Sequence, residues 1–496
     1  MEGKNVLIIG AGVGGLFTGA ILSREGYKVT VLEKNATIGG GLQSFKRFGE
    51  VFDTGMHVVG GMNPGGNIYR LCQYLGIAGK AACYPVDPVH SDRLYFACDK
   101  ATYEIASGRD GFVASFCRYF PAERDNILRY VDAVARIAGE VDLFNLRPSE
   151  TVFPSHSEEF FMAADAFIAK YVSDSRLRAL LAYMNPFYGG RPGQTPAYIH
   201  AIISQLYMAG TGRFAGGTAS FANLLADVIS SAGGRVFTGD AVSEIQMDGK
   251  EISSVITSSG KSYKSDIYIS AIHPCALLGL LPETAFTKAY RDRINSVPNS
   301  YSAFLLYLKL KPDAFPYINT TEYYMTRYSD VWNFGIKDKD WPLGFMFMTP
   351  PEVEQGPYAS KVLITAPMTF SAVERWQDSY TGRRPADYTA FKEECAGKLM
   401  AMIEELHPGF SGAVEASNTA TPLTIRDYYN VKDGSICGFS KDCNNILLSQ
   451  LPVVTKIPNL LLTGQNNNLH GFCGTALTSI TTAEALLGQN YIVNKL

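Results

Sequence analysis

The sequence lacks several features that would place a protein quickly in a functional class. Its formal net charge of -3 over 496 residues offers little attraction for a polyanion, so we expect no nucleic-acid partner. Nine cysteines are scattered without a C-x-x-C pair, which disfavours a disulfide framework and structural zinc and indicates a reducing compartment. No uninterrupted apolar run reaches the length of a membrane-spanning helix, so we expect no bilayer crossing.

Signatures of several kinds of catalysis are also missing. There is no Ser-His-Asp order, no metal-spaced set of histidines and no phosphate-binding P-loop. We therefore expect no metal site. The N-terminus leads almost at once into a strand-like run and leaves no room for a signal peptide, so we expect a cytoplasmic protein. At 496 residues the chain is too long for one compact core, and two domains are expected.

The N-terminal segment carries a glycine pattern typical of dinucleotide binding. The apolar run 6–9 has the character of a strand buried on both faces, and Gly10, Gly12 and Gly15 follow it in G-x-G-x-x-G spacing. The first glycine makes a tight turn, the second lets a pyrophosphate approach the backbone, and the third lets a helix pack on the strand. The N-terminus of that helix would hold the diphosphate.

A second strand and an acid complete this pattern. Residues 28–32 are expected to form a strand that ends at Glu33, where a carboxylate can accept hydrogen bonds from ribose hydroxyls. An isolated glycine pattern also occurs as a structural turn in other α/β proteins. The order strand, helix, strand and acid favours a βαβ dinucleotide site instead.

More glycines and a short polar motif follow. The triplet at 39–41 permits close backbone approach to a ligand, and Asp53-Thr54-Gly55 is typical of a tight turn within the segment F-D-T-G-M-H. With Glu33, these residues predict the ribose-side wall of an FAD site.

These motifs resemble the N-terminal signature of the flavoprotein group that contains phytoene desaturases, carotenoid isomerases and amine oxidases. Residues 53–57 are most similar to the retinol saturase and carotenoid isomerase branch, whose members often have D-T-G-x-H here. Many members have Arg where this chain has Gly41. A backbone N–H would here replace the charged contact that the Arg makes with a phosphate or with the flavin. The resemblance implies an α/β fold in which a Rossmann-like FAD-binding domain of the glutathione reductase type is interleaved with an α+β substrate domain.

A second motif of the same family lies near the C-terminus. Residues 458–471 read as a strand ending in glycine, followed by a polar loop, and Gly474 is expected to open a helix over 476–487. Where many relatives have an acid that binds the ribityl hydroxyls, this chain has Gln465, whose amide can bond the same groups. By the resemblance, the backbone at Val242 pairs with adenine. The expected FAD-binding residues are Gly10, Gly12, Gly14, Gly15, Glu33, Lys34, Gly40, Gly41, Leu42, Thr54, Gly55, Met56, His57, Val242, Gly464, Gln465, Gly474, Thr475 and Ala476.

Between these motifs the pattern of the sequence changes twice. Residues 69–207 are mostly helical and rich in aromatics, and the apolar stripe in 123–143 belongs either to a plain core or to a cap lining a lipid-sized tunnel. Strand-like runs after residue 300 suggest an antiparallel sheet whose face would floor a cavity. The domain assignment is therefore FAD-binding for 1–90, 205–275 and 445–496, and substrate-binding for 91–204 and 276–444.

Two histidines are candidates for catalysis because each follows an FAD segment. His57 and His470 could stabilise charge at the flavin or protonate a carbanion, or each could be a structural histidine bonded to backbone. His200 and His273 are expected to pack or cap. Cys473 lies close to the flavin loop, and some relatives tether FAD through a cysteine there, although nothing around it requires that.

The resemblance implies an FAD-dependent oxidoreductase that saturates, desaturates or isomerises carbon–carbon double bonds of an apolar polyene or isoprenoid. We favour saturation, because both histidine-containing segments resemble that branch. The alternatives are an amine oxidase-like enzyme and a non-catalytic flavin-bearing lipid carrier. No second G-x-G-x-x-G marks a built-in NAD(P)H domain, so a separate electron donor or acceptor is expected. An apolar substrate would also bring the protein into peripheral contact with a membrane.

Overall fold

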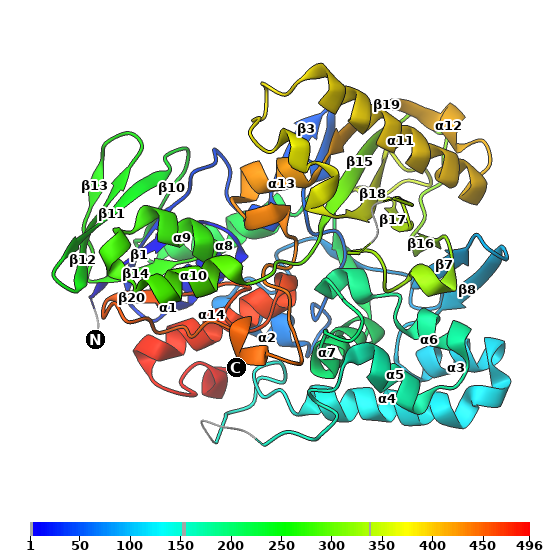
Figure 1. The fold of residues 1–496 in the computed structure, drawn as a ribbon, viewed down its shortest axis with the longest axis horizontal. Helices are drawn as coiled ribbons and strands as arrows, with labels where there is room; N and C mark the ends of the chain where they lie inside the picture. The colour runs from blue at the N-terminus through cyan, green and yellow to red at the C-terminus, as the bar shows by residue number, and fades with distance from the viewer. Residues whose placement is uncertain (1–2, 151–154, 337–338) are drawn as a thin grey trace.

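A parallel five-stranded sheet organises one half of the molecule (Figure 1). The computed structural model describes residues 3–150, 155–336 and 339–496. The sheet has the order β10-β2-β1-β14-β20, and each pair of neighbours runs parallel. Its strands are β1 (Asn5–Ile9), β2 (Lys28–Leu32), β10 (Arg235–Phe237), β14 (Ile267–Ser270) and β20 (Leu460–Leu462).

Both faces of this sheet are covered, as the apolar run in β1 requires. Val6 and Ile8 belong to a hydrophobic core on the face covered by three helices, whereas Leu7 and Ile9 belong to a separate core on the other face. The three helices are α1 (Val13–Arg24), α8 (Ala219–Ser231) and α14 (Gly471–Leu487). The other face carries the antiparallel β11 (Val242–Asp248), β12 (Glu251–Thr257) and β13 (Ser262–Tyr263), with α9 (Pro274–Leu280) and α10 (Lys288–Ser296).

A seven-stranded mixed sheet organises the other half. Its order is β19-β15-β18-β17-β16-β7-β8, and among these pairs β16 and β7 run parallel while the others are antiparallel. The strands are β7 (Asp92–Phe96), β8 (Ala101–Ile105), β15 (Ser302–Leu310), β16 (Thr321–Met325), β17 (Gly344–Met348), β18 (Lys361–Met368) and β19 (Val414–Ala420). Helices α11 (Ala386–Leu406) and α12 (Phe410–Ala413) pack on its outer face.

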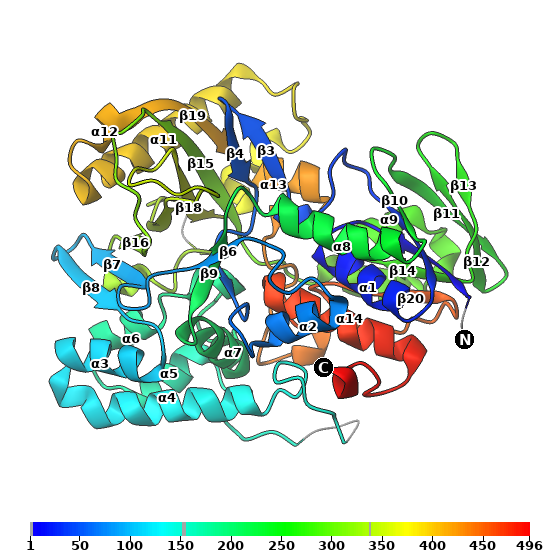
Figure 2. The same cartoon turned by 180° about the vertical axis from the view of Figure 1, so that it is seen from behind.

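A helical layer lies below this sheet in the view of Figure 2. It consists of α3 (Arg109–Tyr119), α4 (Arg124–Gly139), α5 (Ala164–Tyr171), α6 (Ser175–Leu181) and α7 (Ala197–Met208). In its core His200 lies between two tyrosines, with the hydroxyls of Tyr130 and Tyr188 at 2.6 and 3.0 Å from its ring nitrogens. His200 is therefore a packing residue, as the sequence suggested.

Shorter elements connect the two halves. They are β3 (Ser44–Arg47), β4 (Glu50–Asp53), β5 (Val59–Gly60), α2 (Asn67–Leu75), β6 (Cys83–Pro85), β9 (Thr211–Phe214) and α13 (Pro422–Tyr429). The carboxylate of Asp53, at the end of β4, accepts hydrogen bonds from the backbone N–H and the hydroxyl of Thr218 at 2.8 and 3.0 Å. Asp53 therefore ties β4 to the residue that precedes α8.

The expected fold class is confirmed: a Rossmann-like sheet is interleaved with an α+β region. Strand β2 has the predicted bounds. Helix α14 begins at Gly471, earlier than predicted, so Gly474 lies inside it. A Cβ on Gly474 would approach the Cβ of Leu469 to 2.7 Å, so a larger residue would clash there. Among the described residues, no helix combines the length and apolarity needed to cross a bilayer.

Candidate active site

One cavity of about 460 Å³ reaches from the parallel sheet to the seven-stranded sheet. Its first wall is built from the residues that directly follow four parallel strands: Gly10 after β1, Glu33 after β2, Ala271 after β14 and Thr463 after β20. The carboxyl edge of an open parallel sheet is the usual ligand-binding edge in α/β proteins. This wall is therefore where a dinucleotide is expected.

Glycines make room at this wall. Gly10 and Gly464 adopt φ angles of 101° and 112°, which side-chain-bearing residues rarely adopt. A Cβ on Gly12 or on Gly41 would meet nothing within 4 Å, whereas a Cβ on Gly14 would lie 2.9 Å from the Cα of Gly464. Gly12 and Gly41 thus leave open space, and Gly14 permits contact between the two ends of the chain.

Two helix N-termini converge on the same wall. Helix α1 packs against α14, and residues from the first turn of each line the cavity, including Val13, Gly14 and Phe472. No side chain caps either N-terminus. The free N–H groups and the partial positive charge of a helix start together favour an anion such as a diphosphate.

Glu33 is held firmly at the end of β2. Its carboxylate accepts hydrogen bonds from the backbone N–H groups of Ala11 and Asn35 at 2.8 and 2.9 Å. The neighbouring Lys34 donates to the carbonyl of Asp427 at 2.6 Å, and burial lowers the pKa of its ammonium group. The carboxylate is thus fixed beside the glycine loop, where it can accept from a sugar hydroxyl.

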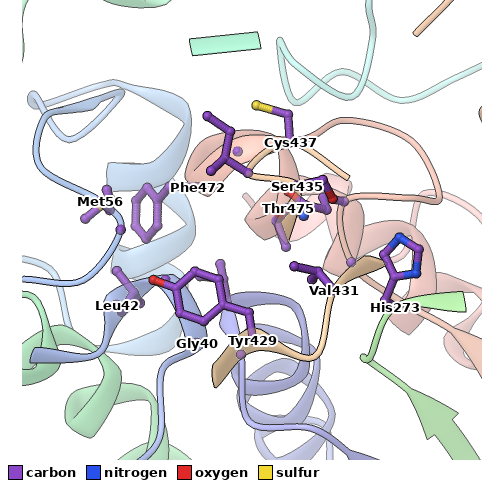
Figure 3. A pocket seen from close by; sticks show the side chains of 18 of the residues that line it. Gly40, Leu42, Met56, His273, Tyr429, Val431, Ser435, Cys437, Phe472 and Thr475 are labelled. Carbon is purple, nitrogen blue, oxygen red and sulfur yellow. The ribbon is translucent and has the colours of Figure 1, made fainter. Parts of the chain in front are cut away.

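The middle of the cavity is framed by residues from distant segments (Figure 3). Tyr429 is the last residue of α13 and Val431 follows that helix, whereas Met56 follows β4 and Phe472 belongs to α14. The hydroxyl of Tyr429 donates to the Thr54 hydroxyl at 2.8 Å. The C-terminal end of α13 is thereby attached to the turn that follows β4.

The second wall of the cavity is apolar and comes from the seven-stranded sheet and the helical layer. Strands β15 to β18 and the segment around residue 187 supply it. The lining residues of this wall are Pro186, Phe187, Tyr207, Ala303, Tyr323, Met325, Phe334, Phe345, Met346, Thr365, Pro367, Ile436 and Cys437. Among the lining residues that the structure describes, only Glu33 and Lys34 are charged acids or bases, and both lie at the nucleotide wall.

The two candidate catalytic histidines differ in position. His57 lines the cavity, and neither of its ring nitrogens has a partner among the described residues. Burial lowers the pKa of His57 to about 4, so its ring is neutral at pH 7. His470 is equally buried and unpartnered but does not line the cavity, although the next residue, Gly471, does.

The structure brings most of the expected FAD-binding residues to this one cavity. Of that set, the residues that line it are Gly10, Gly12, Gly14, Glu33, Lys34, Gly40, Gly41, Leu42, Gly55, Met56, His57, Val242, Gly464, Gln465 and Thr475. Four others, Gly15, Thr54, Gly474 and Ala476, lie behind the lining. Gly15 packs α1 on β1, because a Cβ there would approach the carbonyl oxygen of Gly10 to 2.0 Å.

Two further residues singled out in the sequence have structural positions. His273 caps α9, with its Nδ1 accepting from the backbone N–H of Cys275 at 3.3 Å, while also lining the cavity. Cys473 is buried with its Sγ 3.5 Å from Oδ1 of Asn67 and is not part of the lining. Burial raises the pKa of the Cys473 thiol to about 12, which disfavours the thiolate needed for a covalent tether.

Sequence reasoning missed the residues of the apolar wall. Tyr323, Phe345 and Met346 lie on strands that resemble any buried strand in the sequence. For Tyr429 the sequence does contain a signal. Thr421 and Thr424, three residues apart, form a capping box that fixes the start of α13, and Tyr429 is the last residue of this helix.

Comparison with known proteins identifies the family. Residues 13–344 match the model of the flavin containing amine oxidoreductases. The chain belongs to this family. It is therefore an FAD-dependent oxidoreductase. Similar proteins also confirm the resemblance to retinol saturases and carotenoid isomerases. The chain is 26% identical to the all-trans-retinol 13,14-reductase of Homo sapiens, over 99% of this chain and 86% of that protein. It is 24% identical to a prolycopene isomerase of Arabidopsis thaliana, over 86% of this chain and 72% of that protein.

The fold is also shared with solved structures. An oxidoreductase from Methanosarcina mazei superposes with a TM-score of 0.64 at 16% identity, covering 97% of this chain and all of that one. The residues present fit FAD: the open glycine backbone, the two uncapped helix N-termini and the Glu33 carboxylate meet at one edge of the sheet.

Proposed function

We propose that this flavoenzyme reduces a carbon–carbon double bond of an apolar polyene. The observation that carries the proposal is one continuous cavity that joins a glycine-lined nucleotide wall to an apolar chamber, whose described lining residues include no charged acid or base. The relatives named as retinol reductase and prolycopene isomerase support a polyene as substrate. Reduction is favoured over isomerisation because the similarity to the reductase extends over nearly the whole chain.

The apolar wall also argues against an amine substrate. A protonated amine entering this chamber would lose its hydration, and burying an unpaired charge is costly. Among the described lining residues the only acid is Glu33, which lies at the nucleotide wall and not in the apolar chamber. An extended hydrocarbon loses no hydrogen bonds on entering the same space.

In this proposal the protein positions the substrate and supplies a proton path. FAD, when bound, provides two-electron chemistry, and Gly10, Gly12, Glu33 and Gly464 would hold its adenosine and diphosphate groups. The apolar wall would exclude water and hold the alkene. His57 is the one of the two candidate histidines placed to exchange a proton with the substrate, because it lines the cavity with both nitrogens free.

Anaerobic incubation of the reduced enzyme with a polyene tests the reaction. Reduction predicts reoxidation of the flavin together with loss of the polyene absorbance band. A band that only shifts, with the flavin still reduced, means isomerisation. Release of peroxide from a panel of amines, without any reaction of polyenes, would overturn the proposal in favour of amine oxidation.

Three further parts of the proposal concern organisation and partners. We assign residues 1–90, 205–275 and 445–496 to FAD binding and 91–204 and 276–444 to substrate binding. A separate electron donor would reduce the enzyme.

Peripheral contact of residues 160–188 with a membrane would give access to a bilayer-dissolved substrate. Flotation with liposomes tests the last point, and protein left entirely in the aqueous fraction would contradict it.

A further inference from the structure

The C-terminal turn of α7 reaches the segment that carries His57. Tyr207 in this turn lines the cavity, and its hydroxyl donates to the backbone carbonyl of Val58 at 3.2 Å. Val58 directly follows His57 in the chain. The ring of Tyr207 packs against Phe187, another lining residue, with ring centroids 4.8 Å apart. One side chain thus connects the apolar wall to the backbone beside His57.

A glycine makes this connection possible. Gly60 belongs to β5, which begins directly after Val58. A Cβ on Gly60 would lie 2.6 Å from the Cγ and 3.0 Å from the carbonyl oxygen of Leu206, the residue before Tyr207. Because Gly60 has no side chain, the end of α7 can lie directly on β5. This close approach brings the Tyr207 hydroxyl within reach of the Val58 carbonyl.

The orientation of the His57 ring depends on the backbone around it. Among the described residues, neither ring nitrogen of His57 has a hydrogen-bond partner. On the N-terminal side, the N–H of Met56 donates to the carbonyl of Gly41 at 3.0 Å. On the C-terminal side, the Val58 carbonyl accepts from Tyr207. These two hydrogen bonds hold the backbone on either side of His57, and a rotation there would turn the imidazole.

The Tyr207 phenol keeps the proton that this hydrogen bond requires. Burial raises the pKa of Tyr207 above its ordinary value of 10, so the phenol is protonated at neutral pH and acts as a donor. Val58 is itself buried. Without the Tyr207 hydroxyl its carbonyl would lose a hydrogen-bond partner, and an unpaired buried carbonyl favours rearrangement of the backbone.

We propose that Tyr207 is a positioning residue for His57. The inference rests on the proposed function, in which His57 exchanges a proton with the substrate, and it adds the group that holds His57 in place. A side chain that exchanges a proton must come within about 3 Å of the reacting group. A misplacement of about 1 Å can cost about 10²-fold in rate. The hydrogen bond from Tyr207 to Val58 therefore sets the distance between the imidazole and the alkene.

Tyr207→Phe tests this role, because it keeps the ring beside Phe187 and removes only the hydroxyl. We expect kcat for reduction of the polyene to fall about tenfold, since a misplaced proton-exchanging group slows the reaction. KM should change by less than about twofold, because the apolar wall that binds the chain is retained. The dissociation constant of FAD should stay the same. An unchanged kcat would overturn the inference.

Tyr198→Phe provides a matched control. Tyr198 is a buried tyrosine of the same helix, its hydroxyl accepts a hydrogen bond from Gln450 at 2.9 Å, and it lies outside the cavity lining. This variant should keep the kcat of the unmodified holoenzyme. A loss equal to that of Tyr207→Phe would show a general effect on α7 and contradict the inference.

A double variant shows whether Tyr207 acts through His57. If it does, Tyr207→Phe should cause less than about twofold further loss of kcat in a His57→Phe background. The same tenfold loss in both backgrounds would contradict the inference, because the two residues would then act independently.

Nuclear magnetic resonance of the holoprotein with labelled histidines gives a readout that needs no turnover. The His57 imidazole signal is assigned by its absence from His57→Phe. We expect Tyr207→Phe to shift this signal and to leave the signal of His200, on the same helix, in place. An unshifted His57 signal would overturn the inference. Failure to reduce any polyene would instead overturn the proposed function, and the shift of the His57 signal would still decide whether Tyr207 positions His57.

Discussion

The backbone of Gly14 touches the backbone of Gly464: a Cβ on Gly14 would lie 2.9 Å from the Cα and 3.2 Å from the N of Gly464. This contact joins the first helix of the chain to the loop after its last strand. Because Gly14 has no side chain, α1 and the loop after β20 can approach closely enough to form one nucleotide site.

Gly14→Ala should destabilise the protein whether or not FAD is bound. The added Cβ meets backbone, which cannot rotate away, so α1 and the loop after β20 must separate. Overpacking of this kind typically costs about 1–3 kcal/mol. Chemical denaturation of the apoprotein measures the loss. A variant with unchanged stability would show that this contact is looser than described.

Gly12→Ala makes a matched comparison, because a Cβ on Gly12 meets nothing in the protein within 4 Å. We expect the apoprotein to keep its stability while the affinity for FAD falls at least tenfold, since the new methyl group occupies the space for the pyrophosphate. Titration of the apoprotein with FAD, followed by flavin fluorescence, gives the affinity. Unchanged affinity would mean that the diphosphate does not approach Gly12.

His57→Phe and His470→Phe should separate the two candidate histidines. Both side chains are buried and unpartnered, but only His57 of the two lines the cavity. Loss of a positioned proton-exchanging group typically lowers turnover by about 10²-fold or more, and we expect this for His57→Phe with FAD binding retained. Turnover in His470→Phe should change little. The reverse outcome in single-turnover experiments would transfer the proton role to His470.

Four buried histidines should make the fold sensitive to acid. Burial lowers the pKa of His57 and His273 to about 4, and that of His200 and His470 to about 3, from an ordinary value of 6.5. Below pH 6.5 the unfolded chain binds protons that the native protein does not, so the free energy of unfolding falls as the pH drops from 6.5 toward 4. The expected loss is on the order of 3 kcal/mol for each histidine. The raised pKa of Asp92 acts in the opposite direction but is a smaller effect.

Urea unfolding at pH 7, 6 and 5 measures this dependence. His470→Phe should show a shallower loss of stability with acid, because one buried imidazole no longer has to be protonated. His90→Gln, which alters a histidine with a 47% exposed side chain, serves as the control and should follow the unmodified protein. Identical pH profiles for all three proteins would show that burial of His470 does not set the acid sensitivity.

The part of the site that the sequence reveals is the part made from local patterns. Gly10, Gly12 and Glu33 lie within one βαβ unit, where strand, turn and acid follow one another at fixed spacing, so their convergence could be predicted. Tyr323 and Phe345 come from strands whose register depends on pairing with distant segments, and no local pattern shows which face meets the cavity. His470 shows another limit: its neighbour Gly471 lines the cavity, but a loop sequence does not fix the direction of each side chain.

The placement of β20 and α14 has a consequence for how the protein matures. Gly464 and Thr475 complete a wall begun by Gly10 and Gly12, more than 450 positions earlier in the numbering. During translation, the early glycine loop emerges from the ribosome long before its counterpart exists. Stable loading of the cofactor is therefore expected to be a post-translational event.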